Sequence, residues 1–327
     1  MPSLRTLCAT VAGAALFAMT STAMTSSAMA QNWPTRSVQT ISPFTAGNAN
    51  DIVARIVLDQ VGRSIGQSFV IENRPGGGGR LGASVVAKAD PDGYTVLLLS
   101  SSLASHVVLH KTLPYDPIKD FTPVALLQQG YFILTVRPES GWKTVAELTA
   151  AMKQKGAKAS YGYGSPPALG SAELYKARAG LQAVSIPYRT AMQSLPQMFA
   201  GELDFQFFDS TQGTPLIAGG KLRGLAITAG KRVPGVDLPT MAEAANIPEF
   251  DISPTWGVFL PAGAPQSVVD RLESWFGQIT KMDSTKLFLS RTHASSFPGD
   301  AKALAAFIPK EIKKWKELAK LAKIQPR

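Results

Sequence analysis

The strongest constraint on the fold is a regular alternation between short apolar runs and longer amphipathic segments. Residues 37–44 form a strand-like run, and residues 51–64 then repeat apolar side chains at helical spacing. The alternation continues with strand patterns at 69–72, 94–99 and 132–136 and helical patterns at 81–89, 144–155 and 303–322. Strands that alternate with helices are typical of parallel sheets with helical crossovers, so the sequence predicts an α/β fold.

The first thirty residues have the pattern of an export signal. Arg5 is their only charged residue, an apolar run covers 7–19, and Ala28-Met29-Ala30 matches a small-residue cleavage site. Cleavage there predicts a periplasmic protein that begins at Gln31. Because the single cysteine, Cys8, lies within this signal, we expect neither disulfides nor thiolate chemistry in the mature protein.

The length and the changes of pattern indicate two lobes. At about 100–200 residues per domain, the chain after the signal is long enough for two cores. Changes at 127–131 and 250–255 predict that the chain crosses twice between the lobes. We therefore expect lobe 1 to contain residues 31–128 and 254–327, and lobe 2 to contain residues 129–253.

The charge balance favours an anionic partner without requiring one. The chain has 33 Lys and Arg residues against 23 Asp and Glu, a net charge of +10. The basic residues are mostly scattered singly, and an exported protein rarely meets nucleic acid, so we expect no nucleic-acid partner. The positive field fits either an anionic ligand or a solvated basic surface.

A glycine run resembles a nucleotide-binding motif but lacks its context. Gly77, Gly79 and Gly82 form the string G-x-G-x-x-G between a strand and a helix. The acidic residue expected about 20 residues further on is absent, since position 102 is Ser102. We interpret residues 76–79 as a flexible loop that closes onto a helix, and no cofactor is predicted.

The sequence also contains no convincing metal or catalytic motif. His106 and His110 have the spacing of two metal ligands on one helix face, but no carboxylate or third histidine is an obvious partner. Ser165 lacks the second glycine of a nucleophile elbow, and His293 is a remote candidate base. We therefore predict neither a metal site nor an enzyme.

The strand-to-helix turn at 43–51 is the first candidate binding site. It contains Phe44, Thr45, Ala46, Gly47 and Asn48. Either residue 50 or residue 51 is expected to cap the following helix. The N–H groups of a first helical turn favour a carboxylate or phosphate, although an ordinary capped turn explains the pattern equally well.

Three similar turns follow in the expected second lobe. The first turn, at 161–171, precedes a helix at 172–179 and offers hydroxyls at 165 and 171. The second turn contains Arg189, and the third turn follows a strand at 204–208. The candidate ligand-binding residues in these turns are Tyr163, Gly164, Ser165, Thr190, Ala191, Phe208, Asp209 and Ser210. One turn in the first lobe and three in the second together predict a hinged cleft.

These segments occur in a recognisable order. The chain contains PF-x-x-G at 43–47, VIENRPG at 70–76, DPDGY at 90–94, LPYDP at 113–117, KDFTPV at 119–124, PYR at 187–189, PTMAE at 239–243 and WGVF at 256–259. In this order they closely resemble the Bug (Bordetella uptake gene) family, the tripartite tricarboxylate transporter receptors related to TctC. The resemblance covers essentially the whole chain after the signal.

The resemblance implies a type II periplasmic binding protein fold, with two α/β lobes and a hinged cleft. It implies a small organic carboxylate ligand, held by backbone amides, hydroxyls and water at 45–48, 163–165, 190–191 and 208–210. It also implies delivery of the ligand to the membrane subunits of a tripartite transporter. Nothing in the sequence requires a dimer, so we expect a monomer.

The ligand and the role stay open at this point. The resemblance favours an aliphatic di- or tricarboxylate, whereas Phe44, Tyr163, Phe207 and Phe208 would suit an aromatic acid unless they are core residues. Asp209 would suit the amino group of an amino acid. A receptor for a signalling partner would have the same cleft. Asn48 and Thr190 replace family glycines, so we hypothesise that they set specificity.

Overall fold

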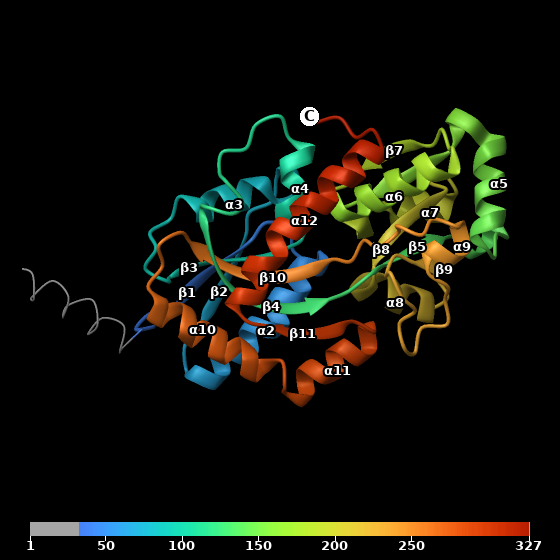
Figure 1. Cartoon of the computed structure of the whole chain (residues 1–327). Coiled ribbons are helices and arrows are strands. Elements are labelled where there is room, and N and C mark those ends of the chain that lie inside the picture. Colours follow the sequence, from blue (N-terminus) through green and yellow to red (C-terminus); the bar gives the residue numbers. More distant parts are fainter. Residues whose placement is uncertain (1–32, 327) are drawn as a thin grey trace, which may run out of the picture.

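The computed structural model describes residues 33–326, so the predicted signal at 1–30 lies outside the described residues. Two β-sheets form the centre of the molecule (Figure 1). The first sheet has the order β11-β4-β10-β3-β1-β2, and the second has the order β7-β6-β8-β5-β9. The first sheet comprises β1 (Val38–Ser42), β2 (Phe69–Asn73), β3 (Thr95–Ser100), β4 (Phe121–Gln129), β10 (Thr255–Pro261) and β11 (Ser295–Gly299). The second comprises β5 (Phe132–Val136), β6 (Ser160–Tyr163), β7 (Val184–Pro187), β8 (Phe205–Asp209) and β9 (Arg223–Ile227).

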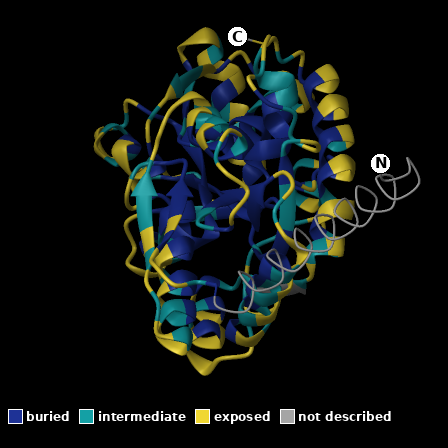
Figure 2. Cartoon of the chain, turned by 90° about the vertical axis from the view of Figure 1, so that its left-hand side faces the viewer, coloured by how far each residue is buried: buried dark blue, intermediate teal, exposed yellow. Residues whose placement is uncertain are grey.

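Helices cover both sheets, and the strands between them are largely buried (Figure 2). The helices that follow strands of the first sheet, or close the chain, are α2 (Ala49–Ile65), α3 (Arg80–Ala87), α4 (Ser102–Leu109), α10 (Gln266–Ile279), α11 (Asp283–Thr292) and α12 (Ala301–Leu321). Those of the second are α5 (Val145–Lys155), α6 (Pro166–Ala179), α7 (Leu195–Ala200), α8 (Ser210–Ala218) and α9 (Met241–Ala245), with a 3-10 turn, η4 (Ala191–Ser194). Within residues 33–326, no helix has the length and apolar character needed to cross a bilayer.

The α/β prediction is confirmed, and the predicted parallel pairing holds for part of each sheet. The pairs β1–β2, β1–β3, β6–β7 and β6–β8 are parallel, as strands joined by helical crossovers should be. By contrast, β10 runs antiparallel to β3 and β4. The reason is topological: β10 enters the first sheet from the direction of the second, so it points the opposite way.

The predicted helices and strands match those of the structure except in one segment, and residues 77–79 of the predicted glycine loop form a 3-10 turn. The expected loop at 161–171 instead contains the end of β6 and the first turns of α6, which begins at Pro166. Ser165 caps this helix by accepting from the Ala168 N–H, and proline is well suited to a first helical position because it needs no hydrogen-bond partner there.

Two neighbouring chain segments and one long helix connect the sheets. The Gly130 N–H donates to the Pro254 carbonyl at 2.8 Å, so the two segments lie side by side. Helix α12 runs diagonally between the halves (Figure 1). It packs closely on α6, since a Cβ on Gly170 would lie 2.5 Å from the Trp315 ring. We propose that the lobes divide near 128/129 and 253/254, with these connections as the hinge.

Candidate ligand-binding site

A small buried cavity of about 30 Å³ lies between the two sheets. It is lined by Phe44, Asn48, Ala49, Asn50, Ser100, Phe132, Gly164, Ser165, Pro167, Ala168, Ala191, Phe207, Asp209, Gln212, Pro254 and Trp256. Six of these, at positions 44, 48, 164, 165, 191 and 209, are among the predicted ligand-binding residues. We call this space the deep cavity.

The first-lobe wall is the beginning of helix α2. Asn48 is its N-cap and accepts from the Asn50 N–H at 3.0 Å, so the expectation that residue 50 or 51 is the cap is wrong. Gly47 has φ of +78°, which the turn requires and which few other residues adopt. The Asn50 side chain instead turns inward and donates to the Leu98 carbonyl at 2.9 Å.

Asp51 stabilises this turn from the side that faces away from the deep cavity. Its carboxylate accepts from the Gly47 N–H at 3.0 Å and pairs with Arg55 at 2.9 Å. Burial pushes the pKa of Asp51 upward, but the hydrogen bonds from Arg55, Asn73 and Gly47 outweigh it and hold the pKa below its usual value. Asp51 therefore orients the Gly47 loop as an anion and does not line the deep cavity.

The beginning of α6 supplies fewer donors than expected. Pro166 and Pro167 have no N–H groups, and the Ala168 N–H is used by the Ser165 hydroxyl at 3.4 Å. The Ser171 hydroxyl donates to the Pro167 carbonyl within the helix, so it is not directed at a ligand. The remaining candidate donors in this wall are the Gly164 and Ser165 backbone and the Ser165 hydroxyl.

Gly164 makes the closest backbone approach in the site. A Cβ at this position would lie 2.2 Å from the Ala191 nitrogen and 2.6 Å from the Thr190 carbonyl carbon. Only glycine allows the β6–α6 turn to pack directly on η4. This contact places Ala191 on the cavity wall, whereas the buried Thr190 does not line the cavity.

Helix α8 provides the fourth wall, and this wall carries the one ionisable side chain among the described residues that line the deep cavity. Asp209 is its N-cap and accepts from the Thr211 N–H at 2.9 Å. Burial raises the pKa of Asp209 to about 6, although the Thr211 N–H opposes the shift. Of the described residues that line the deep cavity, Asp209 is the only one with an ionisable side chain.

The other predicted residues lie close by without lining the deep cavity. Thr45, Ala46 and Gly47 form the partly exposed turn before α2, and Ser210 is fully buried in the first turn of α8. The Phe208 ring packs in an apolar cluster with Met198 and Leu203. Ligand contact through these residues stays a prediction.

One hydrogen bond joins the two lobes across the site. The Gln212 Nε2 group on α8 donates to the Gly47 carbonyl at 2.9 Å. Asn50, Ser100, Gln212 and Trp256 line the cavity without being predicted ligand contacts, because the sequence shows which turns offer hydrogen-bonding groups but not which side chains face the space between the lobes. Asn50 Oδ1 and Trp256 Nε1 are buried without hydrogen-bond partners among the described residues, which is unusual unless a ligand or water supplies them.

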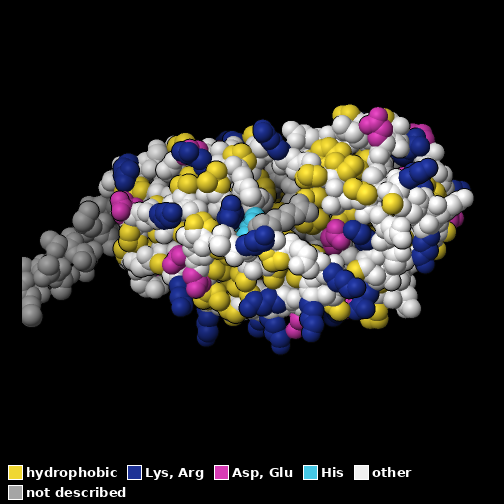
Figure 3. Space-filling model, turned by 90° about the horizontal axis from the view of Figure 1, so that it is seen from above, with side chains coloured by type: hydrophobic (Ala, Val, Ile, Leu, Met, Phe, Trp, Pro, Cys, Tyr) yellow, Lys and Arg dark blue, Asp and Glu magenta, His cyan; other side chains and the backbone are white. Residues whose placement is uncertain are grey.

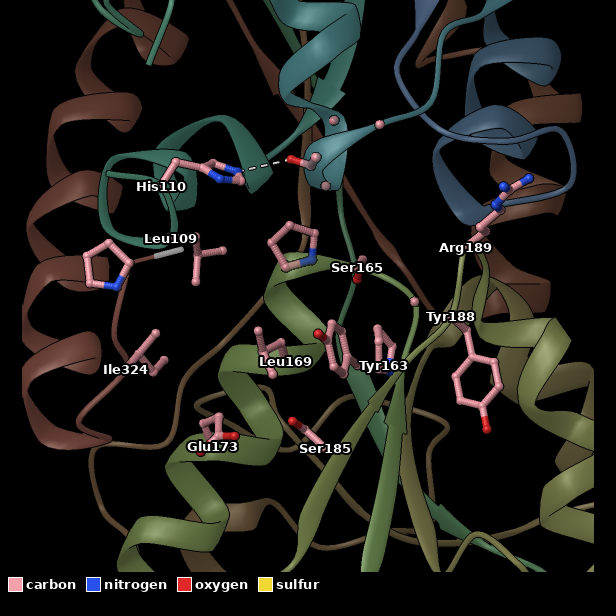
Figure 4. A pocket seen from close by; sticks show the side chains of 18 of the residues that line it. Leu109, His110, Tyr163, Ser165, Leu169, Glu173, Ser185, Tyr188, Arg189 and Ile324 are labelled. Atoms are coloured by element: carbon pink, nitrogen blue, oxygen red, sulfur yellow. Dashed lines mark hydrogen bonds between the residues drawn. The ribbon is translucent and has the colours of Figure 1, made fainter. Parts of the chain in front are cut away.

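A much larger groove of about 1000 Å³ opens beside the deep cavity. Its surface opening lies between the two halves of the molecule (Figure 3). The glycine loop 76–79 forms one side, and Tyr163, Leu169 and the segment that follows α12 form others (Figure 4). We call this space the outer groove.

The two neighbouring histidines fix the glycine loop. His106 Nε2 bonds the Gly78 carbonyl at 3.0 Å. His110 Nε2 bonds the Gly77 carbonyl at 3.1 Å (Figure 4). A carbonyl only accepts, so His106 is the Nε2–H tautomer, and its Nδ1 accepts from the Tyr115 hydroxyl at 2.6 Å. Burial lowers the pKa of His106 to about 4, so it is neutral at physiological pH.

The comparison with known proteins identifies the family. The sequence profile of the tripartite tricarboxylate transporter family receptor, TctC, matches residues 53–324. The chain belongs to this family. The TctC receptors are solute-binding proteins, which agrees with a cavity enclosed between two lobes.

Solved structures of TctC relatives share the whole fold. Rpa4515 of R. palustris, solved with adipate, is 31% identical with a TM-score of 0.86 over 90% of this chain and 100% of that one. The periplasmic binding protein BugD is 27% identical with a TM-score of 0.85 over 90% and 100% of the two chains. MatC of Rhodopseudomonas palustris, solved with malate, is 27% identical with a TM-score of 0.82 over 88% and 99%. The protein therefore has the periplasmic binding protein fold.

Proposed function

We propose that this TctC-family receptor captures a small organic carboxylate in the deep cavity and delivers it to the membrane subunits of a tripartite transporter. The observation that carries the proposal is the convergence of four strand-to-helix turns, from both lobes, on one buried cavity without a basic side chain. Two similar proteins were solved with the dicarboxylates adipate and malate.

The cavity can hold an anion through hydrogen bonds alone. Helices α2 and α8 begin after Asn48 and Asp209, which both line the cavity, so the positive ends of their dipoles lie beside it. Charge-assisted hydrogen bonds contribute about 1.5–3 kcal/mol each, so three or four account for micromolar affinity. The Gln212–Gly47 bond then closes the lobes over the ligand, as in other proteins that close by a hinge.

We extend the proposal to location and chemistry. Residues 1–30 would direct export and be removed, so the receptor would act in the periplasm as a monomer. It would carry out no reaction, since Ser165 is occupied as a helix cap and His106 as a support for the glycine loop. A membrane partner would recognise the closed pair of lobes.

Asp209 supports a second candidate ligand class. A carboxylate on the wall of the cavity would repel an anion when ionised, but it would bind an ammonium or hydroxyl group. An α-amino or hydroxy acid would satisfy both the N–H donors and Asp209. The ligand panel below separates this class from simple dicarboxylates.

We expect a thermal-shift panel of carboxylates to give one clear class of binders. The panel contains aliphatic di- and tricarboxylates, aromatic acids and amino acids, each added to the purified mature protein. A binder at about 100 times its dissociation constant stabilises the protein by about 2.7 kcal/mol, which raises the melting temperature measurably. No shift with any member would contradict the assignment as a carboxylate receptor.

We expect Asn48→Gly to change which acid binds best. Asn48 lines the deep cavity, and glycine is a tolerable N-cap that costs only a few tenths of a kcal/mol. Losing one hydrogen-bonding group next to an anion should change relative affinities by about tenfold, measured by isothermal titration against the best panel members. Thr190→Gly is the comparison variant and should have the smaller effect, because Thr190 does not line the cavity. An unchanged ranking in both variants would rule out these positions as specificity determinants.

A further inference from the structure

The deep cavity and the outer groove differ greatly in size but share a boundary. Their volumes are about 30 Å³ and about 1000 Å³. A space of about 30 Å³ holds a water or two, or a single carboxylate group, whereas pockets for whole organic ligands are about 300–1000 Å³. Phe44, Gly164 and Ser165 line both spaces, so the two are adjacent. A ligand whose carboxylate lies in the deep cavity would therefore extend past these residues into the outer groove.

The walls of the outer groove are suited to an apolar ring. Leu109, Leu169 and Ile324 project into it from α4, α6 and the segment after α12 (Figure 4). Tyr163 stands beside them at the end of β6 (Figure 4). Phe44 lines both spaces and therefore lies at their boundary. Aromatic side chains favour offset or edge-to-face contacts with another ring, beyond the burial of area. A short aliphatic acid would leave these side chains in contact with water.

The charges around the groove favour an anionic ligand. Lys176, Arg189 and Lys323 line it, against one acidic residue, Glu173. Glu173 is paired with Lys176 at 3.4 Å, and Arg189 is exposed at the rim with its guanidinium directed away from the groove centre (Figure 4). A positive rim above apolar walls attracts an amphipathic anion and then buries its apolar part.

We propose that the outer groove is the subsite for the aromatic body of a carboxylate whose acid group lies in the deep cavity. The ligand class is thus an aromatic carboxylate larger than a simple dicarboxylate. This inference rests on the proposed function, because it assumes that the carboxylate occupies the deep cavity.

The test introduces a large side chain into the outer groove from one of its walls. Ser185 on β7 lines the groove, while its neighbour Val184 is 52% exposed and does not line it, since alternate strand residues face opposite ways. We expect Ser185→Trp to weaken naphthoate binding by at least about tenfold and to leave succinate binding within about twofold. The matched control Val184→Trp should change neither affinity. Isothermal titration of wild type and both variants with the two ligands gives the six affinities that this comparison needs.

A second variant is available if Ser185→Trp lowers the melting temperature too far for binding to be measured. Ile324→Trp narrows the groove from the opposite side and should have the same selective effect. Unchanged naphthoate affinity in folded variants, or wild-type protein that binds succinate but not naphthoate, would overturn the inference and leave the carboxylate receptor intact. Failure of the whole carboxylate panel would instead overturn the proposed function, and this inference with it.

Discussion

Replacing Gly164 with alanine should abolish ligand binding, with an affinity loss of at least about 100-fold. The added Cβ would lie 2.2 Å from the Ala191 nitrogen and 2.8 Å from its Cα, and both are backbone atoms that cannot rotate away. The turn before α6 and η4 must therefore separate by more than 1 Å, by comparison with ordinary contacts at 3.4–4 Å. Overpacking of this kind costs about 1–3 kcal/mol of stability, so the protein should still fold.

Titration calorimetry with the best panel ligand and urea unfolding separate the two effects. The matched control is Gly277→Ala in α10, where a Cβ meets no atom within 4 Å. Alanine in a helix interior should stabilise this variant by up to about 1 kcal/mol and leave binding unchanged. If Gly164→Ala folds and binds with wild-type affinity, the contact between the β6–α6 turn and η4 does not shape the site.

Asp209→Asn should stabilise the protein at pH 8 by up to about 3 kcal/mol, and the gain should vanish by about pH 4. Burial raises the pKa of Asp209 from 3.8 to about 6 in the folded state. Each pKa unit corresponds to about 1.4 kcal/mol. A raised folded-state pKa favours the folded protein below the unfolded value, and this contribution is lost as pH rises through 6. Asparagine removes the buried charge and remains a good N-cap.

The measurement is urea unfolding of both proteins from pH 4 to pH 8. His106, whose low pKa makes the native state lose stability as the pH falls from about 6.5 to 4, acts equally in both and cancels in the difference. Asp204→Asn is the control, and it should change the unfolding free energy in the opposite direction. The buried Asp204 is paired with Lys155 and accepts from the Ser160 N–H, so losing its charge should destabilise the protein by about 2 kcal/mol at pH 8. If the difference in unfolding free energy between Asp209→Asn and wild type does not change with pH, the pKa of Asp209 is not raised by burial.

The local elements could be predicted from the sequence because their causes are local. The strand at 132–136 follows from a short apolar run, and the helix that ends at Lys155 follows from helical spacing and a capping box at Thr144. The α6 boundary was mispredicted because paired prolines at 166–167 suit both a loop and a first helical turn. Only the cap formed by the Ser165 hydroxyl distinguishes the two.

The deep cavity could be predicted only in part. Phe44, Asn48 and Gly164 lie in turns whose composition marks them, and the structure places all three on its wall. Gln212 follows the candidate turn after the strand at 204–208, and Trp256 lies in β10, but only the packing of the two sheets brings both side chains to the cavity. The position of β10, antiparallel between β3 and β4, likewise depends on where the chain returns from the second lobe.

The sequence by itself determined the α/β class, the family and the turns that offer backbone N–H groups. The tertiary structure alone decided that Asp209 is buried with a raised pKa, that Gln212 bridges to Gly47, and that the deep cavity continues into an apolar groove. The physical reason is the sequence distance over which each interaction acts. Hydrophobic periodicity and helix capping act between residues a few positions apart, whereas desolvation, lobe closure and cavity shape arise from segments more than 100 residues apart that meet only in the folded chain.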